Sequence, residues 1–309
     1  MTLPDPKSSL EMPTLGLAAA WARYESIRDR LPAAAAPRAT RNVGNLLEVA
    51  AEFDGFLFDS FGVLNVGETA IPGAAECLAT LRRMGKRLRI LTNAASYSGD
   101  AALAKYRQMG LEVLRHEIIS SRDVTFSRLN AVAPGMRWGA IATKEDDFAD
   151  AGGLGIIDIL APGVSWDKTA GFVFLSSVRW TCDHQDRLVA SLIQQPRPVV
   201  IGNPDLVAPR EDGLSIEPGF WAHDLQDRTG IAPHLFGKPY PEAFAMALAG
   251  MDPGRHAMIG DTLHTDILGG QAAGLATILV TDHGLFAGHD TTPYIAQSGI
   301  APDISLPSI

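Results

Sequence analysis

Residues 56–64 read Phe-Leu-Phe-Asp-Ser-Phe-Gly-Val-Leu, and this stretch decides the fold. Its apolar start predicts a short buried strand that ends at Asp59. A helix over 73–85, with Pro72 and Gly73 at its start, and a second apolar strand over 88–91 follow directly. Strand, helix and strand joined by short connections form a βαβ unit, whose strands must be parallel. The sequence therefore predicts an α/β fold with a parallel sheet.

Two further series of strands and helices follow, and the length of 309 residues suits about two domains. Ahead of the first unit, we expect helices over 15–30 and 43–53. The second series has expected helices over 97–109, 121–130 and 184–194, and expected strands over 138–142, 171–175 and 199–201. The third has expected strands over 235–236, 257–259 and 276–280, and expected helices over 241–250 and 265–273. From Gly284 onwards we expect a loop-rich tail.

The composition limits the class of protein. Hydrophobic residues make up 46% of the chain and charged residues 20%, which excludes a disordered chain or a fibre. The net charge of −9 disfavours a general electrostatic attraction to nucleic acid or anionic membrane, and no apolar run is long enough to span a bilayer. Two cysteines, Cys77 and Cys182, cannot form a disulfide framework and fit a reducing compartment. We expect a cytoplasmic protein that binds neither nucleic acid nor membrane.

Polar residues follow three of the expected strands. Asp59 ends the first strand, Thr92-Asn93 the second, and Gly260-Asp261 a later one, with Asp266 five residues further on. A lone acid in such a place is usually a helix cap, but three strand ends and an isolated Gly237-Lys238-Pro239 favour a site. Ligands of open parallel sheets bind at the carboxyl ends of the strands. We therefore expect these residues to meet.

Other constellations are missing from the sequence. It contains no Walker phosphate loop, no His-Glu-x-x-His, no zinc-type cysteine pairs and no dinucleotide glycine fingerprint. Among the eight scattered histidines, we interpret His184, His223 and His264 as surface or capping residues, with a place along the cleft as the alternative.

The four polar clusters resemble the motifs of the haloacid dehalogenase (HAD) superfamily. Residues 58–64 resemble its first motif, Leu91-Thr92-Asn93 the second, Lys238 the third, and residues 259–266 the fourth. Their order and spacing agree with the family over about 43–283. The insert between the second and third motifs is similar to the α/β cap of the nitrophenyl-phosphatase and sugar-phosphatase subclass, IIA. The resemblance implies a Rossmann-like parallel-sheet core with a smaller inserted α/β cap.

This resemblance also implies domain bounds. We expect the catalytic core over 43–97 and 219–309 and the cap over 98–218, with Glu217-Pro218-Gly219 as the hinge back into the core. Residues 1–42 fall outside the resemblance and form an expected helical extension. A Pro- and Ala-rich linker bounds it, so deletion of residues 1–36 is expected to leave the core folded. The alternative is that it covers an apolar patch or forms a subunit contact; a homodimer through the cap or the extension is left open.

The chemistry of the clusters suits phosphate transfer. A carboxylate that attacks phosphorus forms an acyl phosphate and divides hydrolysis into two easier steps. Since the group under attack is negatively charged, the carboxylate needs a shielding cation. Mg²⁺ suits this task, because it favours one or two carboxylates together with phosphate oxygen and water. Asp59 is the expected nucleophile, and Asp59 and Asp261 are the expected Mg²⁺ ligands.

The family pattern adds roles for the other residues. It implies the Phe61 backbone carbonyl as a third metal ligand and Asp266 as a partner for metal-bound water or for Lys238. Lys238 would supply a compact positive charge to the nucleophile and the phosphoryl oxygens, and Thr92 a hydrogen bond. The residues expected to contact the substrate are Asn93, Asn203 and Asp205, the last two from an Asn-Pro-Asp run that resembles one near the end of the family's cap.

One position departs from the family pattern. Phosphatases of the family usually have a second Asp two residues after the nucleophile, where it serves as general acid and base; here that residue is Phe61. Loss of such a group typically costs about 10²–10⁴-fold in rate. We interpret the chain as a phosphatase of small phosphorylated metabolites, with water, a cap residue or a good leaving group in place of that Asp. The alternatives are a phosphate- and metal-binding regulatory protein with negligible turnover, and a dehalogenase-like hydrolase acting at carbon.

Overall fold

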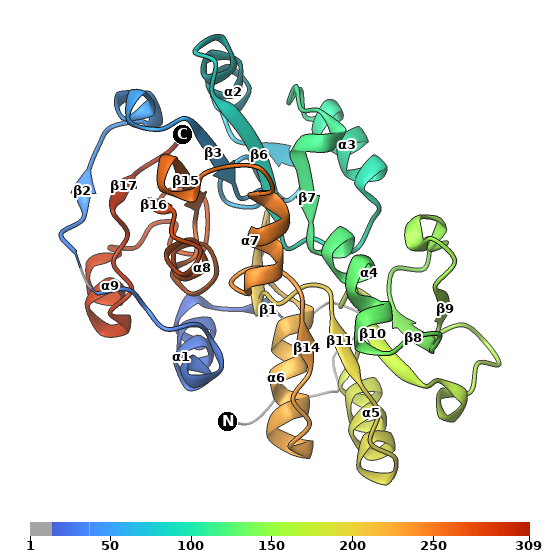
Figure 1. The fold of residues 1–309 in the computed structure, drawn as a ribbon. Coiled ribbons are helices and arrows are strands. Elements are labelled where there is room, and N and C mark those ends of the chain that lie inside the picture. Colours follow the sequence, from blue (N-terminus) through green and yellow to red (C-terminus); the bar gives the residue numbers. More distant parts are fainter. Residues whose placement is uncertain (1–13, 37) are drawn as a thin grey trace.

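The computed structural model describes residues 14–36 and 38–309 and contains two parallel sheets flanked by helices (Figure 1). The larger sheet has seven strands in the order β2-β17-β16-β15-β3-β6-β7. The smaller has five, in the order β14-β11-β10-β8-β9. The α/β fold with a Rossmann-like core and a cap is therefore confirmed.

The strands of the larger sheet are β2 (Arg41–Asn42), β17 (Ile304–Leu306), β16 (Ala276–Val280), β15 (His256–Gly260), β3 (Gly55–Phe58), β6 (Arg87–Thr92) and β7 (Ile118–Ser120). Those of the smaller sheet are β14 (His234–Leu235), β11 (Val199–Ile201), β10 (Gly171–Phe174), β8 (Arg137–Ile141) and β9 (Gly155–Asp158). Two hairpins complete the strands: β4 (Asn65–Val66) with β5 (Thr69–Ala70), and β12 (Val207–Arg210) with β13 (Gly213–Ile216), which β1 (Thr14–Leu15) joins as a third strand.

The helices are α1 (Leu17–Ser26), α2 (Ala74–Arg83), α3 (Gly99–Gln108), α4 (Ser121–Val132), α5 (Cys182–Gln194), α6 (Pro218–Thr229), α7 (Pro241–Ala247), α8 (Leu268–Ala272) and α9 (Thr292–Ser298). A π-helical turn, Leu263–Ile267, precedes α8. None of the helices in the described residues is long and apolar enough to cross a membrane.

The centre of the larger sheet is buried on both faces. Every residue of β3 and of β15 is buried, as expected of parallel strands that helices cover on both sides. The short apolar runs at 56–58 and 257–259 thus correspond to the two central strands, as the sequence predicts.

The sheet membership of two strands differs from the predicted domain bounds. β7, assigned to the cap, pairs with β6 in the larger sheet, and β14, assigned to the core, pairs with β11 in the smaller one. Residues 217–219 are not a hinge into the core either, because Pro218 begins α6, which packs against α5. The predicted limits at 98 and 218 therefore both lie too early in the chain: a short apolar strand carries no local signal for the sheet that it joins.

The tail after Gly284 is loop-rich, as expected, but it also contains α9 and β17, and β17 pairs with β16 and β2. One prediction of local structure is wrong. The expected helix over 43–53 is instead a pair of 3₁₀ turns, Leu46–Glu48 and Ala50–Glu52.

The N-terminal extension packs on the rest of the chain. In Figure 1, α1 lies below α8 and beside α6. Its residues Ala20, Trp21 and Tyr24 are buried in one apolar cluster with Trp221 and Phe286. The extension therefore covers an apolar patch, which was the alternative, and we now expect deletion of residues 1–36 to expose that patch and destabilise the core.

Candidate active site

The three predicted strand ends meet at one edge of the larger sheet. β3 lies between β15 and β6, and Phe58 pairs in register with Ile259 on one side and Ile90 on the other. The backbone N–H of Asp59 donates to the Ile259 carbonyl at 2.8 Å. Asp59 and Asp261 therefore leave adjacent strands at the same level.

Lys238 lies between two carboxylates at the base of this edge. Its Nζ is 2.5 Å from Asp59 Oδ1 and 2.7 Å from Asp266 Oδ1. Lys238 is 1% exposed and Asp266 is fully buried. Burial alone would lower the pKa of Lys238, but the carboxylates of Asp266 and Asp59 hold it above its ordinary value. Lys238 is thus a fixed positive charge beside the expected nucleophile.

The carboxylates of this edge form a cluster that could hold a metal ion. One oxygen each of Asp59, Asp261 and Asp266 lie within 4.8 Å of one another. Burial, the nearby Asp266 and the other carboxylates raise the pKa of Asp59 and raise that of Asp261 to about 7, while Lys238 opposes both shifts. One lysine cannot balance three buried carboxylates. Hard oxygen donors with surplus negative charge suit a divalent cation.

The backbone around Asp261 holds its side chain toward this cluster. Its Oδ2 accepts from the Leu285 N–H at 2.7 Å, and its Oδ1 accepts from the Thr262 hydroxyl at 2.9 Å. Gly62, with φ of +81°, approaches so closely that a Cβ there would lie 2.7 Å from Asp261 Oδ2. The loop after β3, which carries Phe61, therefore lies against Asp261.

Asn93 joins three segments of the chain. Its Nδ2 donates to Asp205 Oδ1 at 2.8 Å and to the Lys238 carbonyl at 2.9 Å. Its Oδ1 accepts from the Lys238 N–H at 2.7 Å and the Ser121 hydroxyl at 2.9 Å. The amide can make no more strong bonds than these. Its geometry favours a positioning role over the predicted contact with substrate.

The turn that delivers Lys238 needs glycine. Gly237 has φ of +146°, and a Cβ there would lie 2.4 Å from Ser121 Oγ and 2.6 Å from Asn93 Oδ1. Only a residue without a side chain allows the backbone to approach the amide of Asn93 so closely. The isolated Gly-Lys-Pro seen in the sequence thus has a steric reason.

Asn203 and Asp205 reach the same edge from the loop after β11. Asn203 Oδ1 accepts from the Asp205 N–H at 3.0 Å, and its Nδ2 donates to Glu217 Oε2 at 3.1 Å. Burial raises the pKa of Asp205 to about 7, against the lowering effect of Lys238. Asp205 is therefore a second titratable carboxyl near the cluster.

A cavity of about 900 Å³ lies over these residues. The predicted site residues that line it are Asp59, Phe61, Thr92, Asn93, Asn203, Asp205 and Asp261. Lys238 and Asp266 do not line it: Lys238 pairs with Asp59 from behind the wall, and Asp266 pairs with Lys238. The structure thus brings all nine predicted residues together, seven on the cavity wall and two behind it.

Phe61 lies in the cavity wall under an arginine that the sequence does not single out. The Arg210 guanidinium carbon is 4.7 Å from the centroid of the Phe61 ring, a cation–π contact. Arg210 Nη2 also donates to Glu217 Oε1 at 2.9 Å, which in turn accepts from the Ser215 hydroxyl at 2.7 Å. Glu217 thus accepts hydrogen bonds from Arg210, Ser215 and Asn203.

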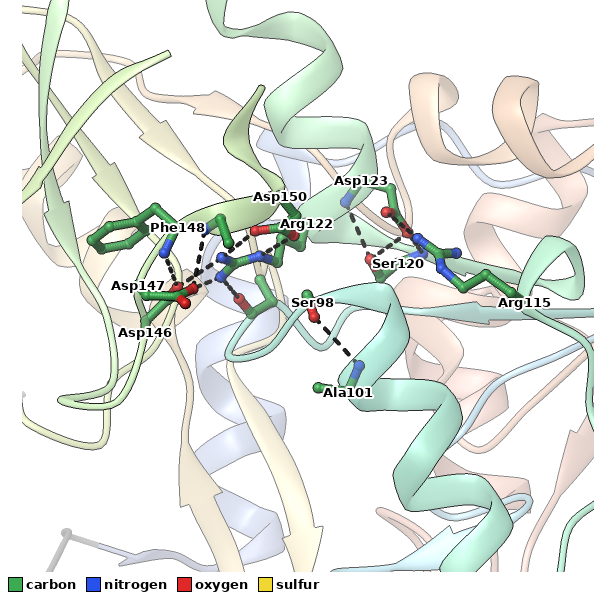
Figure 2. A network of polar contacts seen from close by, with 12 residues as sticks. Ser98, Ala101, Arg115, Ser120, Arg122, Asp123, Asp146, Asp147, Phe148 and Asp150 are labelled. Atoms are coloured by element: carbon green, nitrogen blue, oxygen red, sulfur yellow. Dashed lines mark hydrogen bonds and ion pairs between the residues drawn. The ribbon is translucent and has the colours of Figure 1, made fainter. Parts of the chain in front are cut away.

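Arg122 ties a cap loop to the core on the other side of the cavity (Figure 2). Its guanidinium, 1% exposed, donates to both carboxylate oxygens of Asp146 and both of Asp150. Nη1 also donates to the carbonyl of Ala95, in the loop after β6, at 3.2 Å. With every N–H engaged, Arg122 is a connector and not a free phosphate ligand.

Arg122→Leu is expected to destabilise the protein by about 3–5 kcal/mol, because it leaves buried carboxylates without their counter-charge. Arg115→Leu is the matched control: Arg115 also pairs with two acids, Asp123 and Asp100, but its side chain is 41% exposed. We expect it to cost less than about 1 kcal/mol. Urea unfolding measures both, and equal losses would contradict the connector role.

Two of the three histidines are not on the surface. His223 and His264 are buried, and burial lowers their pKa values to about 3 and about 4. His184 lies in the first turn of α5, where its N–H donates to the Thr181 hydroxyl. The surface or capping interpretation is therefore wrong for His223 and His264.

Sequence reasoning missed Arg210, and it missed Arg122 together with its partners Asp146 and Asp150. Arg122 contacts acids 24 and 28 residues away in the chain, and no motif marks any of them. An arginine in the first turn of a predicted helix is ordinary, so no local signal was present to find it.

Two family models match this chain. One, described as haloacid dehalogenase-like hydrolase, matches residues 56–151, and one described as HAD-hydrolase-like matches residues 235–305. Among proteins of known function, the glycerol-3-phosphate phosphatase of Gallus gallus is 29% identical over 288 residues, which are 84% of this chain and 91% of that protein.

The solved structures to which this chain is similar also include phosphatases. The p-nitrophenyl phosphatase from Archaeoglobus fulgidus has a TM-score of 0.69 and 25% identity, covering 83% of this chain and 97% of that one. The glycerol phosphate phosphatase from Mycobacterium tuberculosis, in complex with calcium, has a TM-score of 0.62 and 26% identity, covering 76% of this chain and 68% of that one. The chain is thus similar to phosphatases over most of its length.

Proposed function

Because the chain belongs to the haloacid dehalogenase superfamily, we propose that it is a Mg²⁺-dependent phosphatase of small phosphorylated metabolites that works through a phosphorylated Asp59. The observation that carries the proposal is the buried ion pair between Lys238 and Asp59 at the floor of the cavity. It holds a carboxylate in place and keeps a positive charge where phosphoryl oxygens would bind. The named phosphatases among the relatives support a phosphate monoester as substrate.

In the first step, an Asp59 carboxylate oxygen forms a bond to phosphorus while the bond from phosphorus to the leaving oxygen breaks. The leaving oxygen takes a proton from water in the cavity, because the ring of Phe61 has none to give. In the second step, water attacks the phosphorus and releases inorganic phosphate and the Asp59 carboxylate. Lys238 neutralises charge on the phosphoryl oxygens in both steps, and Thr92 donates a hydrogen bond to them.

Asp59 and Asp261 would hold Mg²⁺, with the Phe61 backbone carbonyl as a third ligand. Asp266 would accept a hydrogen bond from a water molecule bound to the ion, and it also forms an ion pair with Lys238. When bound, the ion shields the phosphoryl group so that a carboxylate can approach it. The surplus of buried carboxylates supports a divalent cation here, and a relative's structure contains calcium.

The smaller sheet would act as the cap and choose the substrate. Asn203 and Asp205 extend from it into the cavity, so we propose that they contact the substrate or order the water around it. The contacts of Arg122 hold this cap against the core.

We also propose a cytoplasmic location, which the unbonded Cys77 and Cys182 support and imaging of the tagged protein would test. A homodimer would form through the cap, where Val178 and Ile193 are exposed, because α1 is occupied within its own chain. Light scattering at several protein concentrations tests the dimer.

A panel of phosphate esters and 2-haloacids, assayed with and without Mg²⁺, tests the function. We expect Mg²⁺-dependent release of phosphate and none of halide.

Asp261→Asn should weaken Mg²⁺ binding at least about 10-fold, because it replaces a charged ligand of the ion with a neutral one. The melting temperature should stay near that of wild type, because Asp261 lies in a loop after a strand and loss of its negative charge relieves repulsion from the neighbouring carboxylates. Calorimetric titration measures the binding, and a wild-type titration curve would place the ion elsewhere. Mg²⁺ binding without any hydrolysis would favour the regulatory alternative.

A further inference from the structure

Helix α1 encloses the side chain of His264, which lies between two acids of the metal cluster. His264 is in the π-helical turn Leu263–Ile267, three residues after Asp261 and two before Asp266. The ring of Tyr24 stacks on it, with centroids 4.8 Å apart and planes within 8°. Trp21 packs its edge against the same imidazole at 4.9 Å. His264 is fully buried, and Trp21, Tyr24 and Glu25 of α1 all contact its ring.

A hydrogen bond fixes the imidazole in this enclosure. His264 Nε2 is 2.7 Å from Glu25 Oε1, so the ring donates its Nε2–H to the Glu25 side chain. The two aromatic rings and the Glu25 side chain together hold the His264 ring in one orientation. The π-helical turn that carries His264 is held with it.

The turn transmits its position to the metal cluster. The Asp266 N–H donates to the Thr262 carbonyl at 3.0 Å, and the Thr262 N–H donates back to Asp266 Oδ2 at 3.1 Å. Thr262 also donates its hydroxyl to Asp261. A shift of His264 would therefore move Asp266 and Asp261 together. Single π-helical turns are frequent at functional sites.

Tyr24 also reaches the cap side of the cavity. Its hydroxyl accepts from the Leu206 N–H at 3.3 Å, next to Asp205. Before Tyr24 in the same segment, β1 pairs with β13, in the hairpin that carries Arg210. On either side of Tyr24, Arg23 and Arg30 both form ion pairs with Asp227 on α6. The segment thus contacts the metal turn, the loop of Asp205 and the cap helix at once.

We propose that residues 14–30, here called the brace, position the metal-binding turn, with Tyr24 and Glu25 acting through His264. Both family models lie outside the brace, since the first begins at residue 56. The inference rests on the proposed function, because it takes the Asp59–Asp261 cluster as a Mg²⁺ site. Tyr24, Glu25 and His264 are positioning residues that do not touch the substrate.

Tyr24→Leu tests the brace through Mg²⁺ alone. Calorimetric titration of the full chain, without substrate, should show Mg²⁺ affinity about 10-fold weaker than wild type, the lower end for residues that orient metal ligands. Tyr24→Phe keeps the stacked ring and should restore the affinity to within about 2-fold. In turnover, excess Mg²⁺ should recover most of the rate of Tyr24→Leu with an unchanged KM for the ester.

Tyr294→Leu is the matched control. Tyr294, on α9, also packs against Trp21, with ring centroids 4.8 Å apart, but its other ring contact is with Phe286, whereas Tyr24 stacks on His264. It should lower the melting temperature as Tyr24→Leu does and leave Mg²⁺ affinity unchanged. If both variants weaken Mg²⁺ binding equally, the effect is general destabilisation and the brace is overturned.

Glu25→Ala serves as a second variant if Tyr24→Leu does not fold, because the Glu25 side chain is 25% exposed. It removes the acceptor of His264 and should weaken Mg²⁺ binding, whereas Glu25→Gln keeps an acceptor oxygen and should restore it. Wild-type affinity in a folded Tyr24→Leu or Glu25→Ala overturns the brace, and so does a wild-type protein that binds no Mg²⁺. Mg²⁺ binding without hydrolysis overturns the proposed function alone.

Discussion

Asp59→Asn is expected to lower turnover of every phosphate ester by about 10⁴-fold or more, as loss of the nucleophile does in other covalent hydrolases. The amide is a poor nucleophile, so no acyl phosphate can form. It is also a weaker ligand for Mg²⁺ and no longer attracts Lys238, which is left with Asp266 as its ion-pair partner. Initial rates with nitrophenyl phosphate at saturating Mg²⁺ measure the loss.

The fold should survive this change. Asp59 is one of three carboxylates beside a single lysine, so removal of its charge relieves repulsion as well as attraction. We expect a melting temperature at or above that of wild type. Glu68→Gln is the control: Glu68 also lines the cavity, but its side chain is 64% exposed and pairs with Lys105, so activity should stay within about 2-fold. Retention of more than a few per cent of the wild-type rate in Asp59→Asn would remove Asp59 from the nucleophile role.

The central part of the site could be predicted because its signals are local. Asp59 and Asp261 each follow a run of apolar residues at the centre of the larger sheet, and the rule for ligand positions in parallel sheets then brings them together. Lys238 was marked by the glycine before it, which the structure explains by the close approach to Asn93.

The rest depends on contacts between distant parts of the chain. Glu25 and His264 are 239 residues apart, and Tyr24 and Leu206 are 182 apart, so no periodicity or spacing relates them. The same is true of β7 and β14, whose short apolar runs read alike although they join different sheets. Burial of His264 by α1 follows only once both segments have been placed, which is why the sequence favoured a surface position.

Phe61 should make the rate depend steeply on the leaving group. Arg210 covers its ring, and a guanidinium group does not give up a proton in proteins, so it cannot protonate the departing alkoxide. Nitrophenolate leaves without a proton, whereas the alkoxide of a sugar phosphate does not. We therefore expect kcat/KM for nitrophenyl phosphate to exceed that for alkyl phosphates by about 10²-fold or more. A series of aryl and alkyl phosphates, plotted against leaving-group pKa, measures the slope.

Phe61→Asp should flatten that slope by raising turnover of alkyl phosphates about 10²-fold, the low end of what a positioned acid and base supplies. In the wild type, Arg210 lies 4.7 Å from the Phe61 ring. In Phe61→Asp it would pair with the new carboxylate and keep it ionised, so that the carboxylate seldom carries a proton to donate and the gain stays at the low end. Phe61→Asn is the matched control, since it opens the same space and provides no proton; it should leave the slope steep. A shallow slope in wild type, with no gain from Phe61→Asp, would mean that another group, such as the half-buried Asp205, already donates the proton. Inactivity of all three proteins toward every ester, with Mg²⁺ still bound, would instead identify a phosphate-binding protein that has lost turnover together with the acid.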